Sequence, residues 1–547
     1  MNNQEKYEEL TKEELLNIIN SIQDDKKLGL IWEDEDEEIE IEYKKHIPIL
    51  RNIENLNVLT DDKEVNHSLI ESDNLFALQS LQTIYRNKID LIYIDPPYNT
   101  GASDWMYNND YIDKNNDFRH SKWLSMMSRR LKLAKQLLSE IGFIAIAIDH
   151  NELFYLGVLC DEIFGERNRI GTVTIQHHPR GRTQSKFFST TNEFTLVYAK
   201  NIDNVEGNFY LNNTPEETTE DFIRAREDAT PKTRPNLYYP IYFELEKDKI
   251  SLEKPAKNFI EILPLTKNGM RTWKLVKDAF LEELEKENIY VEIKGDEYRV
   301  KRKIKRQKSK LTTNWTDSIY DANPHGNILL KNILGNNDFA FPKSIYAVKD
   351  FVQILTNKNS IVLDFFAGSG TTGHSVMELN KNDNGERKFI LVTNNENEIC
   401  RKITYPRIKN VMTGYKNKKN KFIEGLGGNL YFYDVDLVKS ENSDSFNFKL
   451  SKILVSNICM KEDTLKLFHK EKDFLIYSNS DKKLTLIIFN EESIQLSIQH
   501  LPNDYDSLVF YIYSLEGETF EVELSNLKEK NIEVNSIPFP AYFNIKN

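Results

Sequence analysis

The feature that most constrains the fold is a short apolar run that ends at two prolines. Residues 89–94 read Ile-Asp-Leu-Ile-Tyr-Ile, and Asp95, Pro96, Pro97 and Tyr98 follow them. Bulky and β-branched residues in so short a run predict a buried strand. Proline lacks the N–H that a sheet needs and fixes its own φ, so the strand must end here. The sequence therefore predicts a stiff loop at the carboxyl end of a strand, where open α/β sheets bind their ligands.

This loop carries the groups that an amine-binding site needs. The Asp95 carboxylate and the Pro96 carbonyl are both acceptors, so together they can accept both hydrogens of an exocyclic amine. The Tyr98 ring can stack on the flat ring that carries the amine. The sequence Asp-Pro-Pro-Tyr can also be an ordinary turn that only ends a strand, which is the alternative interpretation. Because they directly follow a predicted strand, we interpret Asp95, Pro96, Pro97 and Tyr98 as a catalytic loop.

A second strand precedes this one and is joined to it by a helix. Leu69 and Ile70 predict a short strand, and leucine and isoleucine then recur at helical spacing over 75–84. Together with the strand at 91–94 this is a βαβ pattern. Asp73 lies between the first strand and the helix. It can bind a ligand amine or ribose, or it can cap the helix N-terminus, and the sequence leaves both open.

Another predicted strand, residues 361–363, ends in a glycine turn. Residues 364–371 read Asp-Phe-Phe-Ala-Gly-Ser-Gly-Thr, and a helix is predicted from about Thr372. Glycines let the backbone pass close to a ligand, and a helix N-terminus offers free N–H groups. A phosphate-binding loop would need Gly-Lys-Ser/Thr, whereas His374 follows Gly373 here. The glycines also match the GxGxxG spacing, so on glycines alone an NAD site stays open.

Length, hydropathy and cysteine spacing bound the class of protein. The 547 residues predict two to four domains. No apolar run approaches the roughly 18 residues that cross a membrane. The first ten residues are polar without an apolar signal segment, so a cytoplasmic protein is expected. The cysteines, Cys160, Cys400 and Cys459, are far apart with no CxxC pair, so neither a disulfide framework nor a zinc site is expected.

The charge of the chain is segregated. The net charge of −13 argues by itself against a nucleic-acid binder, but residues 33–42 are almost wholly acidic and residues 299–310 are mostly basic. Basic side chains among aromatics suit a polyanion with stackable bases, and the alternative is a solvated turn. The candidate DNA-binding residues are Arg299, Lys301, Arg302, Lys303, Lys305 and Arg306.

Changes of pattern divide the chain into five predicted parts. They are a polar segment with a short helix after Thr11 (1–60), the half of an α/β domain with the proline loop (61–200), a polar and aromatic insertion (201–320), the half with the glycine turn (321–415), and a small α+β interaction domain (416–547).

The two motifs together resemble those of the amino-methylating DNA methyltransferases. In that family the FxGxG turn holds S-adenosylmethionine and the Asp-Pro-Pro-Tyr loop holds the target amine. The catalytic motif comes first here, with a long segment before the cofactor motif, and this order resembles the β group. Residues 25–435 resemble the modification (Mod) subunits of type III restriction systems. The matching phrases lie at 94–101, 234–240, 341–343 and 425–430.

The resemblance implies a fold, a reaction and partners. The fold would be α/β, a Rossmann-like methyltransferase sheet with an inserted target-recognition domain and a small α+β C-terminal domain. The reaction would be methyl transfer from S-adenosylmethionine to N6 of adenine in double-stranded DNA, which removes the NAD reading and needs no metal. A homodimer and a separate restriction subunit would be the partners. The cofactor residues would be Asp73, Asp95, Lys343, Asp364, Phe366, Ala367, Gly368, Ser369, Gly370, Thr371, Asn395 and Glu396.

Some alternatives stay open beside this interpretation. Transfer to N4 of cytosine is one, and a non-catalytic DNA-specificity subunit with the same fold is another. In family members, the strand that follows the glycine turn often ends directly at an acidic residue, which comes earlier than Glu396 does here. Here Asn394 and Asn395 precede Glu396, so the ribose contact can be Asn395 or Glu396.

Overall fold

The structure is a computed structural model, and it divides into two compact units. One unit comprises residues 208–311, and the other comprises 1–207 with 312–547. None of the described helices is both long and apolar enough to cross a membrane. The described residues are 32, 46–61, 64–107, 110–113, 118–179, 181, 188–206, 216–224, 226, 228–267, 269–295, 297–306, 311–335, 339, 341–439, 444–513 and 531–537, without side chains at 102–113, 216–218, 305–306, 444–447 and 449.

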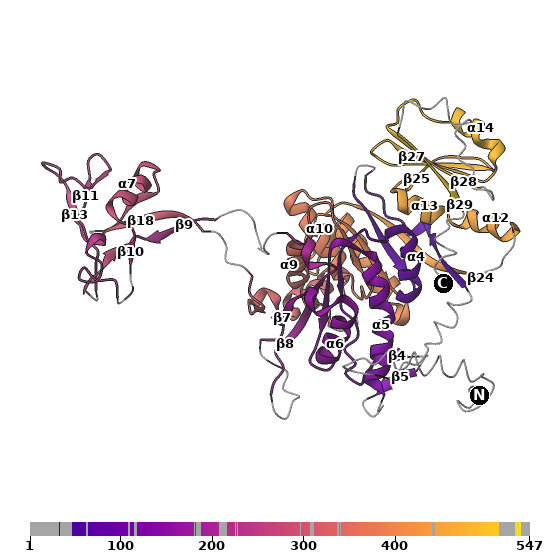
Figure 1. The fold of residues 1–547 in the computed structure, drawn as a ribbon, viewed down its shortest axis with the longest axis horizontal. Coiled ribbons are helices and arrows are strands. Elements are labelled where there is room, and N and C mark those ends of the chain that lie inside the picture. Colours follow the sequence, from indigo (N-terminus) through magenta and orange to yellow (C-terminus); the bar gives the residue numbers. More distant parts are fainter. Residues whose placement is uncertain are drawn as a thin grey trace, which may run out of the picture. The chain divides into compact units, whose positions relative to one another are not determined.

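A ten-stranded mixed sheet forms the centre of the larger unit (Figure 1). Six neighbouring strands of this sheet, β24, β2, β21, β20, β3 and β6, run parallel to one another. At the two ends of these six, β1 pairs antiparallel with β24 and β8 pairs antiparallel with β6. The prediction of a mostly parallel α/β sheet is thus confirmed. The order is β1 (His46–Asn52), β24 (Asn429–Lys439), β2 (Asn66–Glu71), β21 (Lys388–Thr393), β20 (Ile361–Asp364), β3 (Ile89–Ile94), β6 (Leu138–Ile148), β8 (Asn192–Ala199), β7 (Arg169–Gln176) and β19 (Asn314–Trp315).

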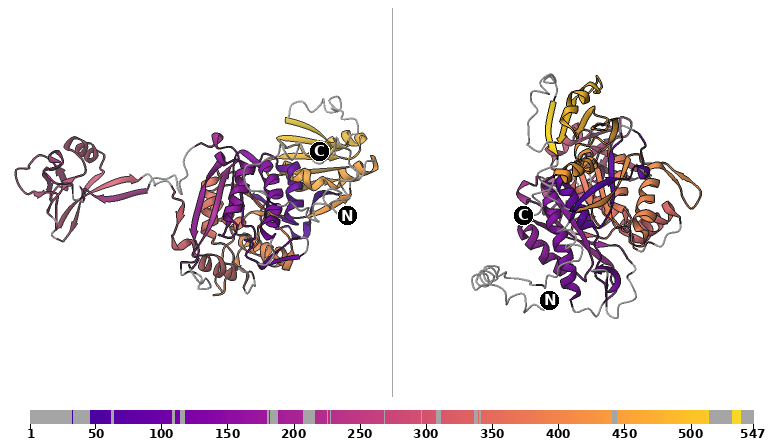
Figure 2. Two further views of the ribbon diagram at one scale, coloured as in Figure 1. Left: turned by 60° about the horizontal axis from the view of Figure 1, so that its bottom comes forward. Right: turned by 90° about the vertical axis from the view of Figure 1, so that its right-hand side faces the viewer.

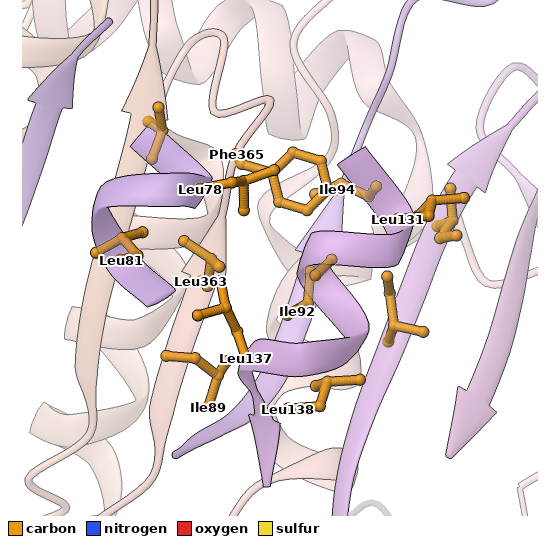
Figure 3. Packing of buried hydrophobic residues seen from close by; sticks show 14 of the residues in the cluster. Leu78, Leu81, Ile89, Ile92, Ile94, Leu131, Leu137, Leu138, Leu363 and Phe365 are labelled. Carbon is orange, nitrogen blue, oxygen red and sulfur yellow. The ribbon is translucent and has the colours of Figure 1, made fainter. Parts of the chain in front are cut away.

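Helices pack on both faces of this sheet, which is why its central strands are largely apolar. Ile92 and Ile94 of β3 belong to one core with leucines of α4 and α5 (Figure 3). On the other face, the Tyr93 ring lies 5.9 Å from the Phe351 ring of α9. The helices are α4 (Asn74–Tyr85), α5 (Arg119–Leu137), α6 (Leu153–Phe164), α8 (Leu329–Leu334), α9 (Ile345–Leu355), α10 (Thr371–Asp383) and α11 (Tyr405–Thr413).

The segment after the proline loop differs from its prediction. Its residues, 99–118, lack periodicity, a pattern that predicts a loop. The structure contains an antiparallel pair there, β4 (Ala102–Tyr107) with β5 (Asp110–Asp113). A polar segment without apolar alternation carries no sequence signal for such a pair. The helix predicted after Thr11 and the acidic run 33–42 lie outside the described residues.

The smaller unit, residues 208–311, is mainly antiparallel and has its own aromatic core. Phe222, Trp273 and Phe280 are fully buried there, with ring centroids 5.4 and 5.6 Å from Phe222. Its elements are β9 (Glu216–Asp221), β10 (Ile223–Arg224), β11 (Ile241–Glu244), β12 (Lys249–Ser251), β13 (Ile260–Ile262), β14 (Leu265–Thr266), β15 (Gly269–Met270), β16 (Thr272–Trp273), α7 (Lys277–Glu285), β17 (Ile289–Lys294) and β18 (Glu297–Arg306).

A five-stranded sheet at the C-terminal end belongs to the larger unit (Figure 2, yellow strands). Ile47 and Ile49 of β1 share a core with α12 and α13, so the main sheet and this region pack together. The boundary predicted at residue 416 needs correction, because β24 (429–439) pairs within the main sheet. The elements are α12 (Asp444–Ile453), α13 (Val455–Glu462), β25 (Lys466–Lys470), β26 (Phe474–Ser478), β27 (Lys483–Ile488), α14 (Ile494–Gln499), β28 (Ser507–Tyr513) and β29 (Asn531–Ile537).

Candidate active site

The proline loop and the glycine turn follow neighbouring parallel strands. Val362 of β20 pairs with Leu91 of β3, so the two strands end at the same edge of the sheet. Asp95 and Asp364 therefore come side by side, although 269 residues separate them in the sequence. Parallel strands present all their carboxyl ends at one edge, and this is where such sheets bind ligands.

The proline loop is held rigidly by groups on α5 and α6. The Trp123 indole N–H donates a 2.8 Å hydrogen bond to the Pro97 carbonyl oxygen. Asn99, which is buried, donates through Nδ2 to the Glu152 carboxylate at 2.5 Å and to the Arg119 carbonyl at 3.2 Å. The backbone of Asn99 has a φ of +56°, a left-handed conformation that asparagine tolerates. The loop is thus preorganised before anything binds.

Lys343 places its ammonium group between two carboxylates at this loop. Its Nζ lies 3.1 Å from Asp95 Oδ1 and 2.6 Å from Glu193 Oε2. It also donates to the Tyr98 hydroxyl and lies 4.6 Å from the centre of the Tyr98 ring. His177 Nε2 lies 3.0 Å from the other Glu193 oxygen. Sequence reasoning grouped Lys343 with the cofactor residues, whereas the structure brings it to the predicted amine site.

Burial and charge act in opposite directions in this cluster. Burial raises the pKa of Asp95, although the Lys343 ammonium opposes the shift. Burial also acts to raise the pKa of Glu193, but Lys343 and His177 outweigh it and hold that pKa below its ordinary value. The pKa of Lys343 is raised because its two carboxylates outweigh its burial. Glu193 is thus held in its charged form by two cationic or donor neighbours, whereas Asp95 has Lys343 as its one cationic neighbour among the causes of its shift.

Sequence reasoning missed Glu193 and His177. They lie on β8 and just after β7, which pair antiparallel to each other, and neither belongs to a motif. A single acid at the start of an otherwise apolar strand was the one available signal for Glu193. The contact with Lys343 spans 150 residues, which no local pattern reports.

The glycine turn winds tightly around the Asp364 carboxylate. Asp364 accepts hydrogen bonds from the Phe366 N–H at 3.0 Å and from the Thr372 hydroxyl at 2.5 Å. Gly368 and Gly370 have φ of +48° and +77°, which only glycine adopts freely. Burial raises the pKa of Asp364 to about 7. A buried carboxylate held close to Asp95 makes this edge of the sheet attractive to a cationic ligand.

Arg407, which sequence reasoning did not find, holds the glycine turn from α11. Its Nη1 donates to the Ser369 hydroxyl at 3.0 Å and to the Thr371 hydroxyl at 2.9 Å. The Thr404 hydroxyl donates to the Gly368 carbonyl at 2.5 Å. The side chains of Ser369 and Thr371 therefore face the protein, so a ligand would meet the backbone of the turn.

A family comparison decides the relationship of the chain. A DNA methylase family, N6_N4_Mtase, matches residues 89–406, which is more than half of the chain. The match begins with β3 and ends within α11, so it contains both motifs and the smaller unit between them. This chain belongs to that DNA methylase family. The predicted resemblance to the amino-methylating DNA methyltransferases is thus confirmed.

The relatives of this DNA methylase include Mod subunits of type III restriction-modification enzymes and a type II methyltransferase. The EcoPI type III Mod subunit of Escherichia phage P1 is 32% identical, and the match covers 64% of this chain and 62% of that protein. The StyLTI type III Mod subunit of Salmonella typhimurium is 31% identical over 65% of this chain and 57% of its own length. The type II methyltransferase M.KpnI of Klebsiella pneumoniae is 30% identical over 63% and 84%, respectively. The chain thus spans about three fifths of the two Mod subunits.

The outer candidates for cofactor binding also lie at this edge of the sheet. Asp73 caps α4, because its Oδ1 accepts a 2.7 Å hydrogen bond from the Leu75 N–H. Asn395, after β21, accepts from the Arg401 N–H at 3.1 Å. The neighbouring Glu396 carboxylate is half-buried. One oxygen of Asp73 is therefore engaged by its helix, and the choice between Asn395 and Glu396 stays a prediction.

The basic run forms a central strand of the smaller unit. Its residues 299–306 lie within β18, between β17 and β9, so for these residues the alternative of a solvated turn is wrong, and residues 307–310 lie outside the described residues. Lys303 is exposed, and the side chains of Lys305 and Arg306 lie outside the described residues. Three of the candidates have acidic partners, which offset their charge. The pairs are Arg299–Glu297 at 2.5 Å, Lys301–Asp221 at 2.7 Å and Arg302–Glu283 at 3.0 Å.

Replacing Glu152 by glutamine is expected to flatten the pH dependence of stability. Burial raises the pKa of Glu152 from its ordinary 4.5 to about 8. Between these values the folded state keeps a proton that the unfolded state releases, so stability falls as pH rises, by at most about 1.4 kcal/mol per pH unit. Urea unfolding across this window should show the slope in the wild type and a weaker slope in Glu152→Gln. Glu166→Gln, whose side chain is exposed, is the control, and parallel curves for all three proteins would contradict the assignment.

Proposed function

We propose that this chain transfers a methyl group from S-adenosylmethionine to N6 of adenine in double-stranded DNA. The observation that carries the proposal is the register of β3 with β20, which brings the amine-binding loop beside the glycine turn. A methyl donor held at the turn and an amine held at the loop would then meet in one site. Membership of a DNA methylase family supports the same reaction class.

The Lys343 contacts support the amine half of the proposal. Its ammonium has nitrogen-bound hydrogens directed at Asp95 and lies over the Tyr98 ring. An adenine would need the same two residues, with its amine at Asp95 and its flat ring on the face of the Tyr98 ring. Because Lys343 also binds Glu193 at 2.6 Å, it can stay on Glu193 when a base takes its place at Asp95. Asp95 then receives the amine without leaving the ammonium unpaired.

The residues of the loop would act mainly by placement and charge. A base swung out of the duplex costs a few kcal/mol of unstacking, which stacking on Tyr98 offsets in part. Asp95 and the Pro96 carbonyl accept the amine hydrogens and orient its lone pair, and the carboxylate stabilises positive charge as it develops on nitrogen. Burial raises the pKa of Asp95, which suits it to receive the proton that the nitrogen must lose.

The glycine turn fits a cofactor of this kind. Gly368 and Gly370 keep the backbone bare, and a Cβ on Gly370 would lie 3.2 Å from Thr404 Cγ2. The buried carboxyl group of Asp364 suits a ligand with positive charge. S-adenosylmethionine, when bound, would supply an activated methyl group on a sulfonium. Phe366, Ala367, Ser369 and Thr371 would contact it through the turn, with Asp73, Asn395 and Glu396 at its outer end.

We further propose that the smaller unit reads the DNA sequence and that the chain is a modification subunit of a type III system. The similarity to two Mod subunits supports this, and a separate restriction subunit and a homodimer are then the expected partners. An enzyme that modifies DNA inside the cell would act in the cytoplasm. Residues 208–311 form a compact unit of their own, inserted in the sequence between the two motifs, and this is the position that a target-recognition domain has in the family resemblance.

Neutralising the exposed basic residues of β18 is expected to weaken DNA binding. Lys303→Gln combined with Arg299→Gln should lower affinity and reduce the slope of log affinity against log salt by about 0.9 for each lost phosphate contact. Fluorescence anisotropy with duplex DNA at several salt concentrations measures both values. Lys257→Gln, an exposed lysine of the same unit outside the run, is the matched control. An unchanged slope in the double variant would remove β18 from the DNA interface.

Sequencing that detects modified bases tests the proposal as a whole. DNA from cells that express this chain should carry N6-methyladenine at one short recognition sequence. DNA from cells that express Asp95→Ala should lack it. N4-methylcytosine at a fixed sequence would instead establish the cytosine alternative. Unmodified DNA, together with intact sequence-specific binding in vitro, would establish a non-catalytic specificity subunit.

A further inference from the structure

Two histidines and a glutamate come together in the C-terminal sheet, away from the proposed active site. They are His469 in β25, Glu471 directly after that strand, and His500 at the end of α14. One ligand atom from each lies within 4.8 Å of the others. Among the described residues, this is the one group of three or more such side chains with that spacing.

Both imidazoles present a nitrogen that is available to a ligand. His500 Nδ1 lies 2.9 Å from the Leu496 carbonyl oxygen, and a carbonyl only accepts. Nδ1 of His500 therefore carries the proton, and its Nε2 keeps a lone pair. His469 Nε2 is buried and has no hydrogen-bond partner. A buried nitrogen without a partner costs free energy, which a bound ion would recover.

The local backbone and packing bring these rings into position. The register of β25 against β26 shifts between Leu467 and His469, and such a bulge redirects a side chain. The two imidazole rings are stacked with centroids 4.4 Å apart. The Phe474 ring lies 5.7 Å from each of them and covers one side of the group.

We propose that His469, Glu471 and His500 bind a divalent transition metal ion, with Zn²⁺ as the best fit. Two imidazole nitrogens and one carboxylate oxygen form a donor set that zinc uses in proteins. His469 Nε2 lies 3.5 Å from Glu471 Oε1. Two tetrahedral ligands about 2 Å from zinc would be roughly 3.3 Å apart, whereas the three ligand atoms lie within 4.8 Å of one another, so the two stacked imidazole rings would turn towards the ion when it binds. The Glu471 side chain is half-exposed, so a fourth position stays open to water.

The ion would join two separate parts of this sheet. It would link the end of β25 to the end of α14, which are 29 residues apart along the chain. The expectation of no metal site came from cysteine spacing, and His-x-Glu with a distant histidine matches no common zinc pattern. An ion pair between protonated His469 and Glu471 is the competing explanation for the cluster.

Metal titration of the full-length chain separates these explanations. After treatment with a chelator, the protein is titrated with Zn²⁺ against a chromogenic competitor. The wild type should bind one more equivalent than His469→Gln or His500→Gln, or bind it at least about tenfold more tightly. Co²⁺ should give visible bands of a tetrahedral site in the wild type that are weak in both variants. His46→Gln, a histidine of β1 outside the group, should behave as the wild type.

Stability supplies a second measurement that does not depend on methyl transfer. Zn²⁺ should raise the unfolding temperature of the wild type, because binding to the folded state stabilises it, and should not raise that of His469→Gln. Equal zinc stoichiometry, affinity and thermal shift in the wild type and both variants would overturn the metal site. Variants that unfold at the same temperature as the metal-free wild type show that the fold has survived.

Discussion

Replacement of Asp95 by alanine is expected to lower the rate of methyl transfer to DNA by about a thousandfold. The carboxylate is the acceptor that orients the amine, and it also stabilises the charge that develops on nitrogen. Lys343 keeps Glu193 as a partner 2.6 Å away, so the loss of Asp95 does not leave a buried ammonium unpaired. The fold and the affinity for S-adenosylmethionine should therefore remain largely intact. Single-turnover transfer of a labelled methyl group, with calorimetric titration of the cofactor, measures both.

The control for this experiment is Asp481→Ala, an exposed aspartate in a turn of the C-terminal sheet. It should match the wild type in both rate and cofactor affinity. If Asp95→Ala lost cofactor affinity as severely as it lost transfer, the amine site and the cofactor site would not be separate. If transfer persisted at a near-normal rate, Asp95 would not be the acceptor of the amine.

Replacement of Gly368 by aspartate is expected to weaken S-adenosylmethionine binding by about tenfold or more, which is at least about 1.4 kcal/mol. Gly368 has a φ of +48°, and a Cβ there would lie 3.4 Å from the Phe339 ring. A side chain would also fill space that the bare turn leaves to the ligand. Equilibrium binding of the cofactor is the measurement, because it separates this effect from any effect on DNA.

Gly295→Asp is the matched control for the glycine turn. Its φ of +60° is close to that of Gly368, and a Cβ there would meet no atom within 4 Å. Backbone strain is thus similar in the two variants, whereas only the side chain of Gly368→Asp would obstruct the cofactor. Unchanged cofactor affinity in Gly368→Asp would place the pocket elsewhere. Equal loss in both variants would point to general destabilisation.

Local sequence determined most of the elements that carry the site. The buried strands at 91–94 and 361–363, and the helix that follows the glycine turn, were predicted from short apolar runs and their interruptions. Asp95 and Asp364 were predicted at strand ends because prolines and glycines stop the strands there. The parallel sheet then brought both ends to one edge. The burial of a strand and the point where it stops are both encoded by a few neighbouring residues, which is why these predictions succeeded.

The tertiary structure alone decided which side chains complete the site. Lys343 contacts Tyr98 across 245 residues, Glu193 reaches Lys343 across 150, and Arg407 supports Ser369 across 38. Lys343 precedes α9, Glu193 lies in β8 and Arg407 lies in α11, and each is a single polar residue there, so periodicity carries no trace of its partner. The zinc ligands of the C-terminal sheet share this property. Apolar patterning reports only that a residue is buried, whereas a charged contact depends on how distant strands are ordered in the folded sheet.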